Sequence, residues 1–245
     1  MADGRSSSMS LSGRRRAFRL AVTLVVSAAL IYAFAATPEE AIMGGLVRIL
    51  YVHVGAAWTA YLAFGVTAAA SAAYLAARKD ALDRLAVASA EWGLVLTTVT
   101  LLTGSIWARS TQGWWWRWDD ARLTLTLMLW FLYAAYLILR QYTEGRRRAT
   151  LSAAIALAAV PAMILNHFAT VLFPAFHPPP VAARAEGPAL AAAYSAGLAL
   201  SVAAFTLLYV EVLAARADLE ARRARRDELS RAALVEGDAE AGYQP

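Results

Sequence analysis

Cysteine is absent from this sequence, and charged residues are scarce. Without cysteine, the chain has no disulfide bond, no thiolate metal ligand and no cysteine nucleophile. Only 17% of its 245 residues are charged and 60% are hydrophobic, whereas a soluble domain averages about 25% charged and about 45–50% apolar residues. The apolar excess also excludes intrinsic disorder, which requires low hydrophobicity. The composition therefore indicates a protein that lies mostly in lipid.

Long apolar runs account for this excess. A helix needs roughly 20 mostly apolar residues to cross the hydrocarbon core of a bilayer, and six such stretches occur at 18–36, 56–77, 85–107, 123–139, 150–173 and 189–215. They predict an all-α polytopic membrane protein whose domain, 1–215, is a six-transmembrane-helix bundle. Pro161 should kink the fifth span. The less apolar segment 39–55 is expected to form a short helix at the membrane surface.

Residues 216–245 form a second predicted region, which is charged. Arg recurs among Asp and Glu at helical spacing as far as Arg231. This pattern favours a solvated extension of the last helix over a docking surface for a cytoplasmic partner or for anionic lipid. Disorder is expected beyond Val235.

Basic residues are distributed unevenly between the two sets of loops. The N-terminus, the loops after the second and fourth spans, and the C-terminus hold 18 of the 23 Lys and Arg residues. Because basic loops mark the cytoplasmic side, both termini are predicted to be cytoplasmic, and the loop between the third and fourth spans external. The net charge of +5 is therefore a topology signal, and no nucleic-acid partner is expected.

Tryptophan is concentrated in that external loop. Five of the eight Trp residues fall between 107 and 118, more than the usual preference of indoles for membrane interfaces explains. Packed indoles would form a flat apolar platform for a large planar ligand, and guanidinium groups at its edges could pair with carboxylates. The residues concerned are Trp114, Trp115, Trp116, Trp118, Arg109, Arg117 and Arg122. A flat ring with two propionates and a central iron, haem, fits these features.

All three histidines, His53, His167 and His177, fall at the predicted external ends of spans. In a chain without cysteine, imidazole is the main soft ligand left for a transition metal. Two imidazoles from separate segments could hold a haem iron axially. A histidine at an interface is also a common polar anchor, so position alone does not select the pair.

The external loop resembles the tryptophan-rich signature W-G-x-W-W-x-W-D of haem-handling membrane proteins. The matching residues are Gly113, Trp115, Trp116, Trp118 and Asp119, with Trp114 at the variable position. The runs 103–108 and 121–124, the six spans and the histidines in the flanking loops extend the likeness. From 18 to 216 the chain is similar to the cytochrome c maturation protein C (CcmC, haem exporter protein C) family.

This resemblance implies a non-enzymatic role in c-type cytochrome biogenesis by the first maturation system, in the bacterial inner membrane. Transiently bound b-type haem would be presented on the outer side to a membrane-anchored periplasmic haem chaperone. An ABC-type ATPase, a second membrane subunit and a small single-span protein are the implied partners. His53 and His177 match the family histidines that bear on the iron, while His167 is interpreted as structural or interfacial. The implied haem-binding set is Trp114, Trp115, Trp116, Trp118, Asp119, Gly113, Arg109 and Arg122.

The chain also departs from the family pattern. Gln112 replaces the first Trp of the signature, and Gly55 stands where Pro is expected, which should loosen the turn into the second span. Asp120 resembles an insertion, so either Asp119 or Asp120 fills the family role. Both aspartates also suit the N-terminus of the fourth span through the helix dipole. Two acidic residues near the cytoplasmic ends of spans, Glu91 and Glu211, are expected to snorkel or to pair with arginines.

The sequence leaves three alternatives open. A cytochrome c synthase of the second maturation system shares the tryptophan signature, but would carry more histidines and either further spans or a large external domain. A b-type electron-transfer subunit needs histidine pairs inside the bilayer. A structural transporter subunit without a ligand leaves the clustered tryptophans unexplained. ATP hydrolysis is not expected, since the chain has no G-x-x-x-x-G-K-[ST] phosphate loop.

Overall fold

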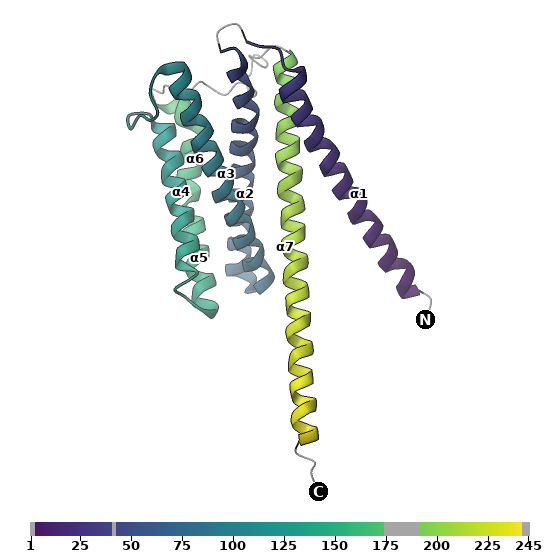
Figure 1. Ribbon diagram of the computed structural model, residues 1–245. Helices are drawn as coiled ribbons and strands as arrows, with labels where there is room; N and C mark the ends of the chain where they lie inside the picture. Colours follow the sequence, from purple (N-terminus) through teal and green to yellow (C-terminus); the bar gives the residue numbers. More distant parts are fainter. Residues whose placement is uncertain (1–2, 41–42, 174–191, 242–245) are drawn as a thin grey trace.

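The computed structural model describes residues 3–40, 43–173 and 192–241 (Figure 1). Within these ranges the regular structure is helical, apart from one isolated bridge between Glu40 and Gly44. Six helical segments are long and apolar enough to cross a membrane, which confirms the predicted all-α polytopic fold. The elements are α1 (Asp3–Ile31), the π-helix η1 (Tyr32–Ala36), the 3-10 helix η2 (Gly45–Arg48), α2 (Ile49–Ala77), α3 (Asp80–Gln112), α4 (Ala121–Leu139), α5 (Gly145–Ala158), α6 (Val160–Leu172) and α7 (Ala192–Ala241).

Helix α2 is the central element of the bundle. It packs against α3, α5 and α7, while α4 packs against α3 and α6, and α1 packs against α7 at the opposite edge (Figure 1). Both chain ends lie toward one end of the bundle, here called the terminal end. The loop between α3 and α4, which carries four of the tryptophans, lies at the other, here called the tryptophan end.

The predicted surface helix over 39–55 is wrong in its extent. Gly44, with a φ of 54°, precedes the single turn η2, and α2 begins at Ile49. Residues 49–55 are therefore the first turns of a spanning helix. Burial of Tyr51, which is 2% exposed, and packing against α7 stabilise these turns, although the segment is less apolar than the rest of the span.

Small side chains let α2 approach its neighbours closely. Helices in lipid associate through close van der Waals packing, because lipid supplies no hydrophobic driving force between them. At Gly55, a Cβ atom would lie 2.6 Å from Cδ2 of Phe205 and 2.8 Å from Oγ of Ser201, both on α7. The prediction that Gly55 loosens a turn is therefore wrong, since this glycine lies inside α2 and allows the contact with α7.

The fifth span is interrupted at the predicted place. Helix α5 ends at Ala158 and α6 begins at Val160, with Pro161 in its first turn. Proline lacks an N–H group and its ring clashes with the preceding turn, so a kink is expected there. The amide of Met163 donates to the Ala159 carbonyl at 3.0 Å, and α6 then continues to the tryptophan end.

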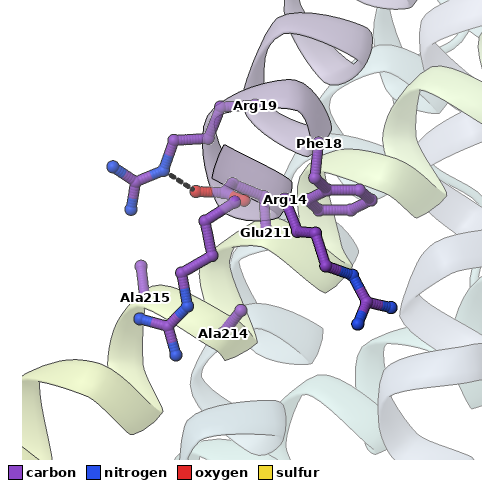
Figure 2. A pocket seen from close by; sticks show the side chains of 7 residues that line it. Arg14, Phe18, Arg19, Glu211, Ala214 and Ala215 are labelled. Atoms are coloured by element: carbon purple, nitrogen blue, oxygen red, sulfur yellow. Dashed lines mark hydrogen bonds and ion pairs between the residues drawn. The ribbon is translucent and has the colours of Figure 1, made fainter. Parts of the chain in front are cut away.

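Ion pairs hold α7 at the terminal end. Arg19 donates through Nε to Oε1 of Glu211 at 2.7 Å and so ties α1 to α7, as Figure 2 shows. Arg216 donates through Nη2 to Oε1 of Glu91 on α3 at 3.4 Å. The expectation that both glutamates pair with arginines is confirmed. Helix α7 continues to Ala241, further than the predicted limit at Val235.

A more deeply buried ion pair joins α3 to α4. Arg140 donates through Nη1 and Nη2 to the two carboxylate oxygens of Asp83, at 2.7 and 2.8 Å. Their side chains are only 11% and 13% exposed. The two-pronged geometry suits a guanidinium and a carboxylate that are largely withdrawn from water.

We expect Asp83→Asn to destabilise the bundle by on the order of 3 kcal/mol, because it leaves a largely buried guanidinium without its counter-charge. Thermal unfolding in detergent, followed by circular dichroism, measures the change. Glu91→Gln is the matched control on the same helix, since that ion pair is longer and more exposed. Equal unfolding temperatures for the two variants would contradict the role given to Asp83.

Candidate functional site at the tryptophan end

The loop that carries the tryptophans is fixed at its start by the end of α3. Gly113 has a φ of 86° in the left-handed region, which glycine adopts without strain and which commonly ends helices. The Gly113 carbonyl accepts a hydrogen bond from Nη1 of Arg109 at 2.7 Å. In the structure, Arg109 and Gly113 thus close the helix end and set where the loop begins.

The other end of the loop is fixed by Asp120. Its carboxylate accepts a hydrogen bond from the amide of Leu123 at 3.1 Å, and its carbonyl accepts one from Thr124 at 3.1 Å. Asp120 is fully buried. The sequence-based expectation that an aspartate begins the fourth span is confirmed for Asp120, which is the N-cap of α4.

Asp119 has a different environment. It is exposed and accepts hydrogen bonds from Nε and Nη2 of Arg117 at 2.9 and 2.5 Å. The Arg117 guanidinium holds the pKa of the Asp119 carboxyl below its usual range, and the same hydrogen bonds raise the pKa of Arg117. Of the two aspartates, Asp119 is the one at the surface of the loop, where a ligand can meet it.

The indoles do not form one flat platform. Trp115 and Trp118 are 60% and 72% exposed. Trp116 and Trp118 contact each other edge to face, with ring centroids 5.6 Å apart and planes inclined at 66°. Trp114 has the Arg117 guanidinium 6.0 Å from its ring centroid. Trp116 and Trp118 therefore do not lie in one plane, as the predicted flat surface requires; their edge-to-face contact is one of the two arrangements that aromatic pairs prefer.

Trp116 offers a hydrogen-bond donor that none of the described residues accepts. Its Nε1 atom is buried and finds no acceptor among the residues that the structure describes. Buried donors are normally paired, since leaving one unpaired costs about 1–3 kcal/mol. A ligand acceptor such as a carboxylate would satisfy this N–H group.

His53 lies in the first turns of α2, where its ring is packed against α3. Its Nδ1 atom is 3.0 Å from Oγ1 of Thr103. A Cβ atom at Gly104 would lie only 2.9 Å from Cε1 of His53, so this glycine makes room for the ring. Gly104 is nine residues before Gly113, which at the usual rise per residue is roughly 13 Å along the axis of α3. The imidazole, which contacts Gly104, therefore lies about that far from the start of the tryptophan loop, toward the terminal end.

Three further residues were singled out from the sequence: His167, Arg122 and His177. His167 on α6 is exposed and contacts Tyr61 and Phe168 edge to face, with ring centroids 5.8 and 4.9 Å away. Its interpretation as a structural or interfacial residue stays a prediction. Arg122 is half-buried in the first turn of α4. His177 lies outside the described residues.

Thr103 and Gly104 are the site residues that sequence reasoning missed. Both belong to the run 103–108 that supported the family resemblance, but neither was assigned a role. Thr103 is 50 positions from His53 along the chain, so only the packing of α2 on α3 reveals the pairing. The tryptophan end thus offers an imidazole, exposed indole faces and an N–H donor that has no acceptor among the described residues.

We expect Asp120→Ala to destabilise the protein by about 1–2 kcal/mol, because it removes the N-cap of α4. Asp120→Asn should keep most of that stability, since an amide oxygen can still cap the helix. Asp119→Ala should leave the unfolding temperature unchanged. Thermal unfolding in detergent distinguishes the three variants, and a larger loss from Asp119→Ala than from Asp120→Ala would reverse the two roles.

The chain is similar to known proteins along nearly its whole length. A family model described as "Heme exporter protein C" (CcmC) matches residues 4–232. Heme exporter protein C of Bradyrhizobium diazoefficiens is 30% identical over 237 residues, which are 96% of this chain and 90% of that protein. The protein of the same name from Rhodobacter capsulatus is 31% identical over 220 residues, 89% of this chain and 90% of its own.

The same name also belongs to an Escherichia coli K12 protein that is 37% identical over 138 residues, 56% of this chain and 55% of that protein. The family match thus spans the six membrane-crossing segments and the tryptophan loop. The resemblance found in the sequence is confirmed: this chain belongs to the heme exporter protein C (CcmC) family, whose members serve haem transport in cytochrome c biogenesis.

Proposed function

We propose that the chain binds haem at the tryptophan end and hands it to a membrane-anchored haem chaperone outside the cytoplasm. The observation that carries this proposal is the position of His53, whose imidazole is held against α3. The loop of exposed indoles projects from the end of the same helix. An imidazole nitrogen can ligate haem iron, and indole faces supply apolar contact for a porphyrin.

The residues of the loop fit a haem in complementary ways. Trp115 and Trp118 expose large apolar surfaces. The buried N–H group of Trp116 lacks an acceptor among the described residues, and a propionate oxygen would provide one. Arg122, at the start of α4, would add a guanidinium for the second propionate. Arg109 and Asp120 fix both ends of the loop. The loop backbone therefore needs no further ordering when haem binds to its side chains.

The binding would be non-covalent and transient. Since the chain has no cysteine, it cannot form a thioether with haem, so the ligand would be held as b-type haem by His53 and His177. Exposed indoles favour capture at an open edge from which a chaperone can remove the ligand. In this proposal the chain breaks and forms no covalent bond and has no catalytic residue; it is a carrier and not an enzyme.

Energy for export would come from partners. The chain has no phosphate loop for ATP, so an ABC-type ATPase with its own membrane subunit would supply it, together with a small single-span subunit. The distribution of basic residues supports an inner-membrane protein with both termini in the cytoplasm. The terminal end, with the charged extension of α7, would then face the ATPase.

We expect purified protein in detergent to show a haem absorbance band that His53→Ala and His177→Ala each largely abolish, because each removes an iron ligand. His167→Ala is the matched control and should keep the wild-type spectrum. If both ligand variants retained haem with unchanged spectra, ligation by these two histidines would be excluded.

The indoles can be tested separately. We expect Trp115→Ala combined with Trp116→Ala to weaken haem binding by about 1–2 kcal/mol, which is about 5- to 30-fold in the dissociation constant, because apolar contact and an N–H donor are lost. Trp58→Ala is the control, since Trp58 is also exposed (56%) but lies on α2 outside the loop. Full haem retention by the double variant would contradict the role of the indoles.

The orientation of the chain in the membrane can be tested separately. An alkaline phosphatase fusion at Ser110 should be active, because the tryptophan end is predicted to be external, whereas a fusion at Gly145 should be inactive. The reverse pattern would overturn the orientation and, with it, the proposed side of haem binding.

A further inference from the structure

We infer that the Thr103 hydroxyl selects the tautomer of His53 whose ring hydrogen is on Nδ1, so that the lone pair on Nε2 is presented to haem iron. This inference rests on the proposed function, which makes His53 a ligand but does not say which nitrogen binds. Thr103 is then a positioning residue: it acts through His53 and does not itself touch the iron.

A threonine hydroxyl has one hydrogen to donate. Oγ1 of Thr103 lies 2.7 Å from the Val99 carbonyl and 3.3 Å from the Thr100 carbonyl, and carbonyl oxygens can only accept. The short contact with Val99 takes the hydroxyl hydrogen, as is common for threonine within a helix. The 3.0 Å contact with His53 is then a hydrogen bond that Nδ1–H donates to Oγ1.

A second threonine on α3 shows the same pattern without ambiguity. Oγ1 of Thr98 donates to the Leu94 carbonyl at 2.9 Å and accepts from Nε1 of Trp130 at 2.8 Å. An indole nitrogen can only donate, so Thr98 must use its hydrogen on the backbone and its lone pair on the ring. Thr103 and His53 repeat this arrangement, with an imidazole in place of the indole.

The neighbouring glycine keeps the ring in place for this bond. A Cβ atom at Gly104 would lie 2.9 Å from Cε1 and 3.4 Å from Nδ1 of His53. The ring therefore rests on the bare backbone of α3, and its Nδ1 edge is turned toward Thr103. With the hydrogen on Nδ1, the other nitrogen carries the lone pair that a metal requires.

This arrangement has a clear chemical consequence. A histidine that binds a metal usually donates its other N–H to a fixed acceptor, which sets the tautomer and makes the ligand more basic. Loss of such an acceptor typically weakens metal affinity by about 10–100-fold. Thr103 supplies the acceptor here from α3, so the tautomer of His53 would be set before haem binds.

The tautomer can be measured directly on the full chain in detergent, without haem. Histidine labelled with nitrogen-15 gives ring signals that distinguish Nδ1–H from Nε2–H, and His53→Gln identifies the signals of His53. We expect Nδ1–H in the wild type and in Thr103→Ser, which keeps the hydroxyl. Thr103→Val should lose that preference, while Thr100→Val should not. Nε2–H in the wild type, or an unchanged preference in Thr103→Val, would overturn the inference.

Haem titration of the same variants tests the consequence. Thr103→Val should bind haem about tenfold more weakly or worse, with Thr103→Ser near the wild type. Thr100→Val is the matched control, because it removes an equivalent backbone hydrogen bond, from Oγ1 to the Leu96 carbonyl at 2.9 Å. Equal affinities for Thr103→Val and the wild type would contradict the positioning role. A wild type that binds no haem would instead refute the proposed function. The nitrogen-15 spectra would still test the tautomer of His53 in that case.

Discussion

Close packing between helices in lipid is the constraint on which the rest of the structure depends. Because lipid gives no hydrophobic drive for association, α2 can hold its central place only where small side chains let its neighbours approach. Gly55 faces α7 and His53 faces α3. Residues that are two positions apart on a helix point to nearly opposite sides, so α2 is packed on both sides here. Packing on both sides therefore fixes the direction of the His53 ring, and Gly104 completes the contact.

The tryptophan loop is held by groups at its two ends. Arg109 closes α3, and Asp120 begins α4 with a buried carboxylate. Between them, Arg117 and Asp119 pair at the surface, where water screens their attraction. The loop thus owes its shape to helix-end hydrogen bonds, and its exposed indoles are not needed to hold it. This separation leaves the indoles available for a ligand.

The fold was largely predictable from sequence, whereas the geometry of the site was only partly so. The six spans follow from runs of apolar residues, and Pro161 marks the break in the fifth. The start of α2 was misplaced because the helix over 49–55 is stabilised by contacts with α7, which hydropathy does not report. The clustered tryptophans pointed to the loop, but not to the inclination of their rings.

Pairings across helices lay beyond sequence reasoning for the same physical reason. His53 and Thr103 are brought together by the packing of α2 on α3, and a lone threonine in a span ordinarily satisfies its hydroxyl on its own helix. The two aspartates were both suited to a helix N-terminus. Only the structure distinguishes Asp120, a buried cap that accepts from the amide of Leu123, from Asp119, which is exposed and pairs with Arg117.

The contact between α1 and α7 has a consequence for biosynthesis. α1 packs mainly against α7, and only 6% of its apolar window is buried inside the protein. During synthesis, α1 lacks its main packing partner within this chain until α7 has been inserted. Arg19 then meets Glu211, 192 positions later in the chain. The contact between α1 and α7 can therefore form only after α2 to α6 have been translated.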